Sequence, residues 1–323
     1  MSSPTPTDLL GEIYSQWIDE ITKHPDMSLR LLRIIFDDWQ RATAEPEDVS
    51  YRHTSIGGVP GILVTPLESD PLQVQILMHG GGFALGSSAS HRKLAGHLAK
   101  ACGTVSFVAD FRLAPEHKFP AQIEDGVSIY RALLEQGYRP EDITPVGDSA
   151  GGNLAISLTM ELGALGLPLP GQVITMSPWL NMHNDGVTIE TNDATDFLIA
   201  REGLLANIDR YIDGATEPTN PRANPLYADF TGFPRLYICA ADTESLFDDS
   251  VRLNRRALDA GVDVTFSIGH GMQHVYPFLA GRHPRADEEI QLIAEWYRAS
   301  RTAEGRQGAP ELVDTTSSST FQN

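Results

Sequence analysis

The stretch PVGDSAGGNL, residues 145–154, places one serine, Ser149, among glycines directly after a short apolar run. The pattern Gly-x-Ser-x-Gly is typical of a nucleophilic serine on a sharp strand-to-helix turn, where a side chain on either glycine would collide with the strand or the helix. Both halves of that context are present, because ITPV precedes the motif and AISLTMELGAL follows it. A phosphate-binding loop would need a Lys-Ser or Lys-Thr pair after its glycines, and none follows. The residues therefore favour a nucleophile over a phosphate loop or a chance loop.

A nucleophilic serine needs a base, and histidine is the usual one. In a fold with this turn, the base follows the serine in the chain, so the candidates are His183, His270, His274 and His283. His274 lies in GHGMQHVY, just past the last predicted strand, where a loop can hold an imidazole over the edge of a sheet. His270, four residues earlier, directly follows that strand. The residues alone leave these two histidines as alternatives.

The base in turn needs a carboxylate that orients it. Asp242 ends the run LYICAAD, at the predicted carboxyl tip of a strand, which is where α/β folds place functional groups. Glu244 is the alternative to Asp242. We predict Asp242 as the acid.

A third motif, MHGGGF at residues 78–83, follows the apolar run VQIL. Three consecutive glycines let the backbone turn its N–H groups toward a developing oxyanion, and one such donor lowers the barrier by roughly 3–4 kcal/mol. The amide after the nucleophile, that of Ala150, is the expected further donor. The sequence therefore contains a nucleophile, base and acid candidates, and an oxyanion-binding loop.

The elements that must position these groups alternate along the chain. Short apolar runs read as buried strands, and amphipathic helical patterns lie between them, which predicts an α/β fold with a mostly parallel sheet covered by helices on both faces. The predicted strands are two around a Gly-Gly turn within residues 50–66, and then those at residues 74–80, 104–111, 143–147, 172–178, 235–241 and 262–269.

Two helical patterns precede the first strand, and another, at residues 193–212, interrupts the alternation. We interpret the later segment as an insertion above the carboxyl edge of the sheet. The two N-terminal helices are either an ordinary packing layer or a lid over an apolar site. The predicted organisation is an N-terminal cap segment at 1–45, the first part of the α/β core at 46–185, a cap insertion at 186–234, the second part of the core at 235–301, and a polar, disordered tail at 302–323.

The charge balance limits the partners. With 43 acidic and 24 basic residues, the formal net charge is −19, which argues against nucleic acid and anionic membranes. No apolar run approaches the ~18–20 residues that span a bilayer. Residues 1–10 do not have the pattern of a signal peptide, and two cysteines, Cys102 and Cys239, give no disulfide framework. We expect a cytoplasmic protein that binds a small apolar molecule.

The motifs HGGGF, FRLAPEHKFPA, GDSAGGN, AADTESLFDDS and GMQH, in this order, resemble those of the hormone-sensitive-lipase-like α/β-hydrolases over residues 73–300. The resemblance implies an α/β-hydrolase fold with an eight-stranded sheet and a helical cap, and it needs no metal or cofactor. It favours His274 over His270. The residues that it implies are a Ser149–His274–Asp242 triad and oxyanion donors from Gly81, Gly82 and Ala150.

Within that family, the long N-terminal helices and the residues of the motifs look most similar to those of bacterial lactone hydrolases, such as monoterpene ε-lactone and zearalenone lactone hydrolases. The expected activity is therefore serine-dependent hydrolysis of a lactone or macrolactone. The alternatives are a short- or medium-chain carboxylesterase or deacetylase and, in another class, a non-catalytic ligand receptor. The resemblance also implies a homodimer formed through the strand near residues 264–268.

Four side chains flank the motif residues and are predicted to line the substrate pocket: Phe83, Trp179, Leu198 and Tyr276. One departure from the family bears on the acid. AADTESLFDD has Thr243–Glu244 where a run of the Asp-Pro-Leu type is commoner.

Overall fold

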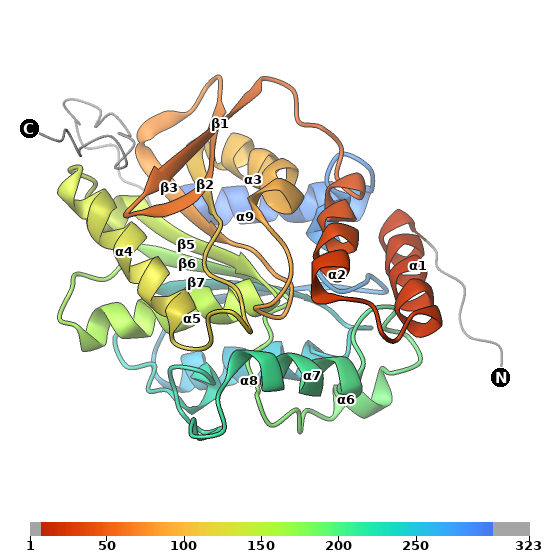
Figure 1. The fold of residues 1–323 in the computed structure, drawn as a ribbon. Helices are drawn as coiled ribbons and strands as arrows, with labels where there is room; N and C mark the ends of the chain where they lie inside the picture. The colour runs from red at the N-terminus through yellow and green to blue at the C-terminus, as the bar shows by residue number, and fades with distance from the viewer. Residues whose placement is uncertain (1–7, 300–323) are drawn as a thin grey trace, which may run out of the picture.

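An eight-stranded sheet forms the centre of the computed structural model, which describes residues 8–299 (Figure 1). The strand order is β1-β2-β4-β3-β5-β6-β7-β8. The pairs β1–β2 and β2–β4 are antiparallel and the other neighbours are parallel, so the predicted, mostly parallel sheet is confirmed. The strands are β1 (Val49–Ile56), β2 (Val59–Pro66), β3 (Asp70–Met78), β4 (Thr104–Ala109), β5 (Ile143–Asp148), β6 (Gln172–Met176), β7 (Arg235–Ala241) and β8 (Val264–Gly269).

The chemistry of the turns and strands explains this order. Gly57 and Gly58 join β1 to β2 with φ values of 60° and 80°, and a two-residue hairpin with both φ positive favours glycine. Every residue of β5 and β6 is buried. Strands buried along their whole length suit the centre of a parallel sheet, which helices cover on both faces.

Helices form a layer on each face of the sheet (Figure 1). α3 (Ser88–Cys102) and α9 (Pro284–Ala299) pack together on one face, where Leu94 and Ile290 belong to the same core cluster. α4 (Ala121–Glu135) and α5 (Ala150–Ala164) cover the other face and share a second cluster, through Ile129 and Leu154. α8 (Phe247–Asp259) lies on the side of α5, with a third cluster between them.

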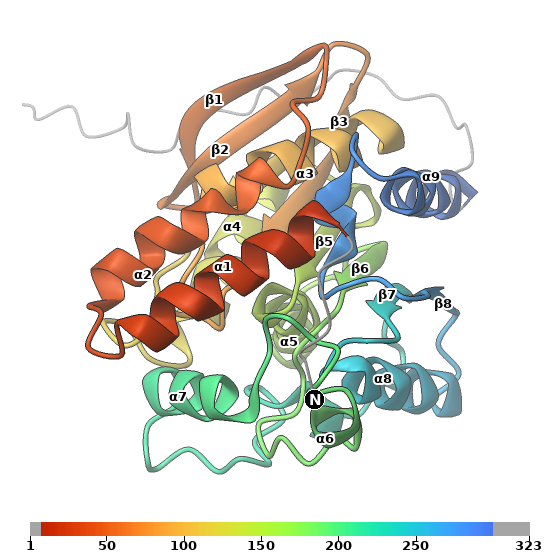
Figure 2. The same ribbon diagram turned by 90° about the vertical axis from the view of Figure 1, so that its right-hand side faces the viewer.

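The remaining helices lie beyond the carboxyl ends of the parallel strands. α1 (Leu9–Lys23) and α2 (Leu29–Phe36) run side by side, and α6 (Thr188–Thr191) and α7 (Arg201–Tyr211) lie across from them (Figure 2). Asp8 caps α1, because its carboxylate accepts the Gly11 N–H at 2.8 Å. Within the described residues, no helix is both long and apolar enough to cross a membrane. The predicted tail at residues 302–323 lies outside the described residues.

The helix predicted at residues 193–212 is shorter than expected. The segment before α7 instead turns around Asp196, whose Oδ1 accepts the N–H groups of Leu198 at 2.9 Å and Ile199 at 2.8 Å. An aspartate that binds the backbone two and three residues ahead offers those amides an alternative to helical hydrogen bonds. The helix therefore begins at Arg201.

Candidate active site

Ser149 occupies the sharp turn between β5 and α5. Its φ of 52° and ψ of −122° are unusual for a residue with a side chain, as expected of a strained turn. A Cβ on Gly147 would overlap the carbonyl oxygen of Gly151, and a Cβ on Gly151 would overlap that of Met78. Both glycines of the motif are therefore required by close backbone contacts. The turn also places the amide of Ala150 at the N-terminus of α5, where the helix dipole favours negative charge.

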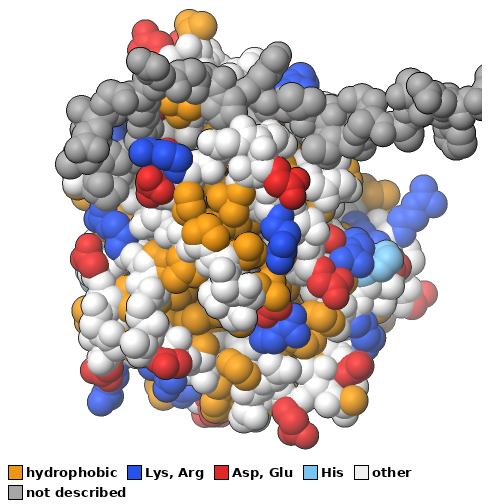
Figure 3. Space-filling view, turned by 90° about the vertical axis from the view of Figure 1, so that its left-hand side faces the viewer, with side chains coloured by type: hydrophobic (Ala, Val, Ile, Leu, Met, Phe, Trp, Pro, Cys, Tyr) orange, Lys and Arg blue, Asp and Glu red, His pale blue; other side chains and the backbone are white. Residues whose placement is uncertain are grey.

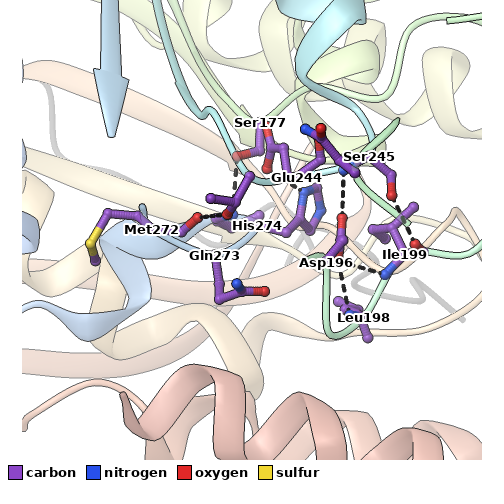
Figure 4. A network of polar contacts seen from close by, with 12 residues as sticks. Ser177, Asp196, Leu198, Ile199, Glu244, Ser245, Met272, Gln273 and His274 are labelled. Atoms are coloured by element: carbon purple, nitrogen blue, oxygen red, sulfur yellow. Dashed lines mark hydrogen bonds and ion pairs between the residues drawn. The ribbon is translucent and has the colours of Figure 1, made fainter. Parts of the chain in front are cut away.

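His274 is oriented by Glu244 (Figure 4). Its Nδ1 donates to Glu244 Oε2 at 2.8 Å, and both side chains are buried. His274 Nε2 is also buried and has no hydrogen-bond partner among residues 8–299. Because Ser149 and His274 line the same cavity, this nitrogen is available to a group that enters the cavity at the serine.

Charge and burial shift the pKa values of His274 and Glu244 in opposite directions. Burial lowers the pKa of His274, but the charge and hydrogen bond of Glu244, together with the charges of Asp196 and Asp148, outweigh burial, so the pKa lies above its ordinary value. Burial likewise raises the pKa of Glu244, while the charge and the hydrogen bond of His274 hold it down only in part. The pair is therefore strongly coupled, and the carboxylate stabilises a positive charge on the imidazole.

The predicted pairing of Asp242 with His274 is wrong. Asp242 lies at the surface, where its Oδ2 accepts from His270 Nδ1 at 2.8 Å and its Oδ1 accepts from Gly271 N at 2.7 Å. It is the first residue after β7, and its side chain turns outward from the strand end. The turn that follows brings Glu244, two residues later, back to the buried side of the sheet edge. This geometry assigns the role that orients the imidazole to Glu244.

A signal for Glu244 was present in the sequence. Glu244–Ser245–Leu246 fits an acid-x-Leu run, so the Asp-Pro-Leu type of motif corresponds to Glu244 better than to Asp242.

The segment around Asp196 holds the loop that carries Glu244 (Figure 4). Asp196 Oδ2 accepts the N–H of Ser245 at 2.7 Å, and the Ser245 hydroxyl donates to Ile199 O at 3.0 Å. Asn192 Nδ2 donates to the carbonyl oxygens of Asp242 and Glu244, both at 2.9 Å. The position of the acid therefore depends on contacts with residues 192–199.

The glycine loop presents free backbone donors. Gly81 and Gly82 have φ values of 113° and 61° and line the same cavity as Ser149. Among residues 8–299, the N–H groups of Gly81, Gly82 and Ala150 have no acceptor. The N–H of Gly80 differs, because it donates to Asp148 Oδ1 at 3.2 Å and so ties the loop to the residue before the serine.

The cavity at Ser149 has a volume of about 410 Å³, within the usual range for small-molecule sites. Its walls are mainly apolar and come from α1, α2, the segment before α7, and α7 itself. The apolar lining residues are Ile18, Ile21, Leu32, Phe36, Trp39, Leu85, Leu198, Ile199, Ala200, Leu204 and Ala206.

Of the four predicted pocket residues, Leu198 lines this cavity and the other three predictions are wrong. Phe83 stacks on Tyr211 at 3.7 Å between ring centroids. The indole of Trp179 donates to Asn184 Oδ1 at 3.1 Å, and the Tyr276 hydroxyl donates to Glu289 Oε2 at 2.7 Å. The three side chains are buried next to the motifs, but they pack into the protein and not into the cavity.

The N-terminal helices contact the site through residues that the sequence analysis did not identify. The Tyr14 hydroxyl of α1 donates to the carbonyl oxygen of His274 at 2.9 Å and accepts from Trp39 Nε1 at 3.2 Å. Arg33 of α2 donates from Nε to Ala84 O, just after the glycine loop, at 2.9 Å. In the sequence these residues belong to ordinary amphipathic patterns, so nothing marks them as partners of the site.

Comparison with known proteins finds a matching family and similar ester hydrolases. Residues 75–278 match the model of a family described as having the alpha/beta hydrolase fold. The chain is similar to an acetyl-hydrolase of Streptomyces hygroscopicus, with 34% identity over 86% of this chain and 98% of the relative. It is 33% identical to an esterase of Acinetobacter venetianus over 82% of this chain and 87% of the relative. A crystal structure of an esterase from the bacterial hormone-sensitive lipase (HSL) family superposes with a TM-score of 0.86 at 32% identity, covering 92% of this chain and 99% of that one.

Proposed function

Because this chain belongs to the hormone-sensitive-lipase-like α/β-hydrolases, a family of carboxylic ester hydrolases, we propose that it cleaves small uncharged esters through an acyl-enzyme on Ser149. The observation that carries the proposal is the buried Glu244–His274 pair, whose free Nε2 faces the cavity that Ser149 lines.

The proposed reaction has two halves. His274 Nε2 takes the proton of the Ser149 hydroxyl as its oxygen attacks the ester carbonyl, and the amides of Gly81, Gly82 and Ala150 bind the oxyanion. The tetrahedral intermediate collapses, the C–O bond to the alcohol breaks, and the imidazolium returns its proton to the departing oxygen. Water then attacks the acyl-enzyme, again with His274 as base, and releases the carboxylic acid and free serine.

Glu244 contributes to both halves by holding the imidazole. Its hydrogen bond to Nδ1 leaves Nε2 as the atom that exchanges a proton with the serine, and its charge stabilises the imidazolium that each attack creates.

The substrate is proposed from the cavity and the relatives. A mainly apolar cavity of about 410 Å³ suits a short uncharged ester, and the similar proteins are named acetyl-hydrolase and esterase. We propose lactones, including ε-lactones and zearalenone-type macrolactones, as a narrower class. Cap elements on two sides of the cavity supply apolar surface for both arms of a cyclic ester, and ring opening would release one hydroxy acid.

A substrate panel separates these classes. The panel contains p-nitrophenyl acetate and longer p-nitrophenyl esters, an ε-caprolactone-type ring and a resorcylic macrolactone. Hydrolysis confined to the acyclic esters would remove the lactone proposal and leave a short- or medium-chain carboxylesterase or deacetylase.

Replacing the nucleophile tests the proposal itself. Ser149→Ala should lower kcat by about 10⁴–10⁶-fold, as loss of a triad nucleophile generally does. A p-nitrophenyl phosphonate should label the wild-type protein once per chain and leave Ser149→Ala unlabelled. Undiminished hydrolysis by a pure Ser149→Ala preparation would refute the acyl-enzyme, and an unlabelled wild-type protein would favour a non-catalytic receptor.

Location and assembly complete the proposal. We propose a cytoplasmic protein that forms a homodimer through β8, because β8 is an edge strand of the sheet and the outer side of an edge strand can pair with another chain. Light scattering coupled to size exclusion would measure the dimer, and a monomer at micromolar concentration would contradict it.

A further inference from the structure

Two polar side chains in the wall of the cavity, those of Asn207 and Arg210, have no role in the chemistry described so far. Asn207 and Arg210 face the cavity from α7, and Arg210 Nη1 donates to Asn207 Oδ1 at 2.8 Å. Among residues 8–299, the Arg210 side chain donates to this amide oxygen and forms no ion pair with a carboxylate. Its guanidinium is thus committed to the amide oxygen of a neighbour in the same wall.

The hydrogen bond from Arg210 fixes how the amide of Asn207 is turned. A guanidinium can only donate, so the atom that faces it must be the amide oxygen and not the nitrogen. The amide nitrogen, Nδ2, therefore points the other way and has both of its hydrogens to donate. Among the described residues, Nδ2 has no acceptor.

Asn207 Nδ2 lies against the glycine loop, beside Gly82. A Cβ on Gly82 would overlap Asn207 Nδ2, so the amide nitrogen occupies the space beside Gly82 that glycine leaves open. Gly82 is one of the proposed oxyanion donors and lines the cavity together with Ser149 and Asn207. The cap thus places an unpartnered N–H donor next to the backbone amides that would bind the substrate carbonyl.

We propose that Asn207 is a further catalytic residue, which donates from Nδ2 to the substrate carbonyl oxygen as that atom becomes an oxyanion. Arg210 is a positioning residue that holds the amide in the donating orientation and adds positive charge behind it. The inference rests on the proposed ester hydrolysis. It also gives the cap a part in the chemical step, because α7 must lie against the glycine loop before the fourth donor is in place.

The first test removes the donor. Loss of a single oxyanion donor generally costs about 10²–10³-fold in kcat, and with three backbone amides still present we expect Asn207→Ala to lose about 10–100-fold. The loss should fall on kcat and leave KM of p-nitrophenyl butyrate within about threefold, because the interaction strengthens only in the transition state. Asn207→Asp keeps the acceptor for Arg210 but replaces the donor by a negative oxygen, and should lose more than Asn207→Ala.

Changing one atom of the substrate distinguishes a hydrogen bond donated by Asn207 from a packing effect of its side chain. In a thionoester, sulfur replaces the carbonyl oxygen and accepts hydrogen bonds poorly. The ratio of kcat/KM for the ester to kcat/KM for its thionoester should therefore fall in Asn207→Ala by about the factor by which ester hydrolysis falls. An unchanged ratio, with both substrates slowed equally, would show that Asn207 acts through packing and would overturn the proposal.

Matched variants keep the test decisive. Leu205→Ala lies on the same helix, but its side chain is half exposed and lies outside the cavity, so it should keep the wild-type ratio. Arg210→Met should lower the ratio in the same direction as Asn207→Ala, by a smaller factor. If Asn207→Ala does not fold, the nearly isosteric Asn207→Asp carries the same comparison. A wild-type protein that hydrolyses no ester would refute the proposed function, whereas an active wild type with an unchanged ratio in the variants would refute only the role of Asn207.

Discussion

At the scale of single residues, the proposed role of His274 as a base depends on the acid beside it. The Glu244 carboxylate raises the pKa of His274 above its ordinary value in spite of burial. Because the base must be neutral, kcat/KM should rise with pH through that raised pKa. Glu244→Gln removes the charge that opposes burial, so the pKa of His274 falls and the acidic limb of the pH profile moves to lower pH. We expect kcat to fall by about 10³–10⁴-fold at the same time, as when the acid of a triad is replaced by its amide.

Asp242→Asn is the matched control for this prediction. In the wild-type protein, the Asp242 carboxylate accepts hydrogen bonds from His270 and Gly271 at the surface. The substitution should leave the acidic limb in place and change kcat/KM by less than about threefold, as expected for a surface change worth ~0.5 kcal/mol. If Asp242→Asn moved the limb and Glu244→Gln did not, the assignment of the acid would be reversed.

The two carboxylates also show what a sequence can predict about a site. The turn at Ser149 was predictable, because its strand, glycines and helix are adjacent in the chain. The choice between Asp242 and Glu244 depends on the direction in which the turn after β7 points each side chain, and on a partner about thirty residues away. Phe83 and Trp179 were misplaced for the same reason, since a neighbour of a motif residue in sequence can point into the core.

At the scale of elements, α1 supports the loop that carries His274. The Tyr14 hydroxyl donates to His274 O and accepts from Trp39 Nε1, and all three residues are buried. Tyr14→Phe leaves the carbonyl oxygen and the indole N–H without this partner, which costs about 1–3 kcal/mol of stability. The loop also loses an anchor, so kcat should fall by about tenfold, the effect of ~1.4 kcal/mol on the barrier, while KM changes little.

Tyr138→Phe separates the two effects. The Tyr138 hydroxyl also donates to a carbonyl oxygen, that of Pro71 at 2.8 Å, but it lies at the amino end of β3, away from the site. Thermal unfolding and steady-state kinetics of both variants provide the comparison. A similar loss of melting temperature is expected in both, with a fall of kcat only in Tyr14→Phe. An unchanged kcat in Tyr14→Phe would show that α1 supports the fold but not the chemistry.

Elements were easier to predict from the sequence than their contacts. Buried parallel strands are continuous apolar runs, so each predicted strand overlaps an observed one. The start of α7 was missed because the side chain of Asp196 competes for the amides that a longer helix would use. The contact of α1 with His274 could not be predicted, because it joins residues 260 positions apart in the chain.

At the scale of the whole molecule, the excess of acidic residues should make stability depend on salt. The formal net charge is −19, so repulsion among carboxylates opposes the compact state. Ion pairs such as Lys23–Asp19 and Arg255–Asp259 are largely exposed, and exposed pairs of this kind contribute only about 0–1 kcal/mol each. On the face shown in Figure 3, acidic and basic side chains are interspersed, so no single charged patch dominates there. The long-range repulsion should therefore outweigh the loss of these pairs when salt is added.

Raising NaCl from about 20 to about 300 mM shortens the Debye length from roughly 20 Å to below 8 Å and screens most of this repulsion. We expect the melting temperature to rise by about 1–2 °C, which corresponds to ~1 kcal/mol for a chain of this size. Differential scanning fluorimetry in NaCl measures the change, and equal concentrations of sucrose serve as the control for effects that do not involve charge. A melting temperature that falls with NaCl would mean that the surface ion pairs contribute more to stability than the repulsion among the surplus carboxylates removes.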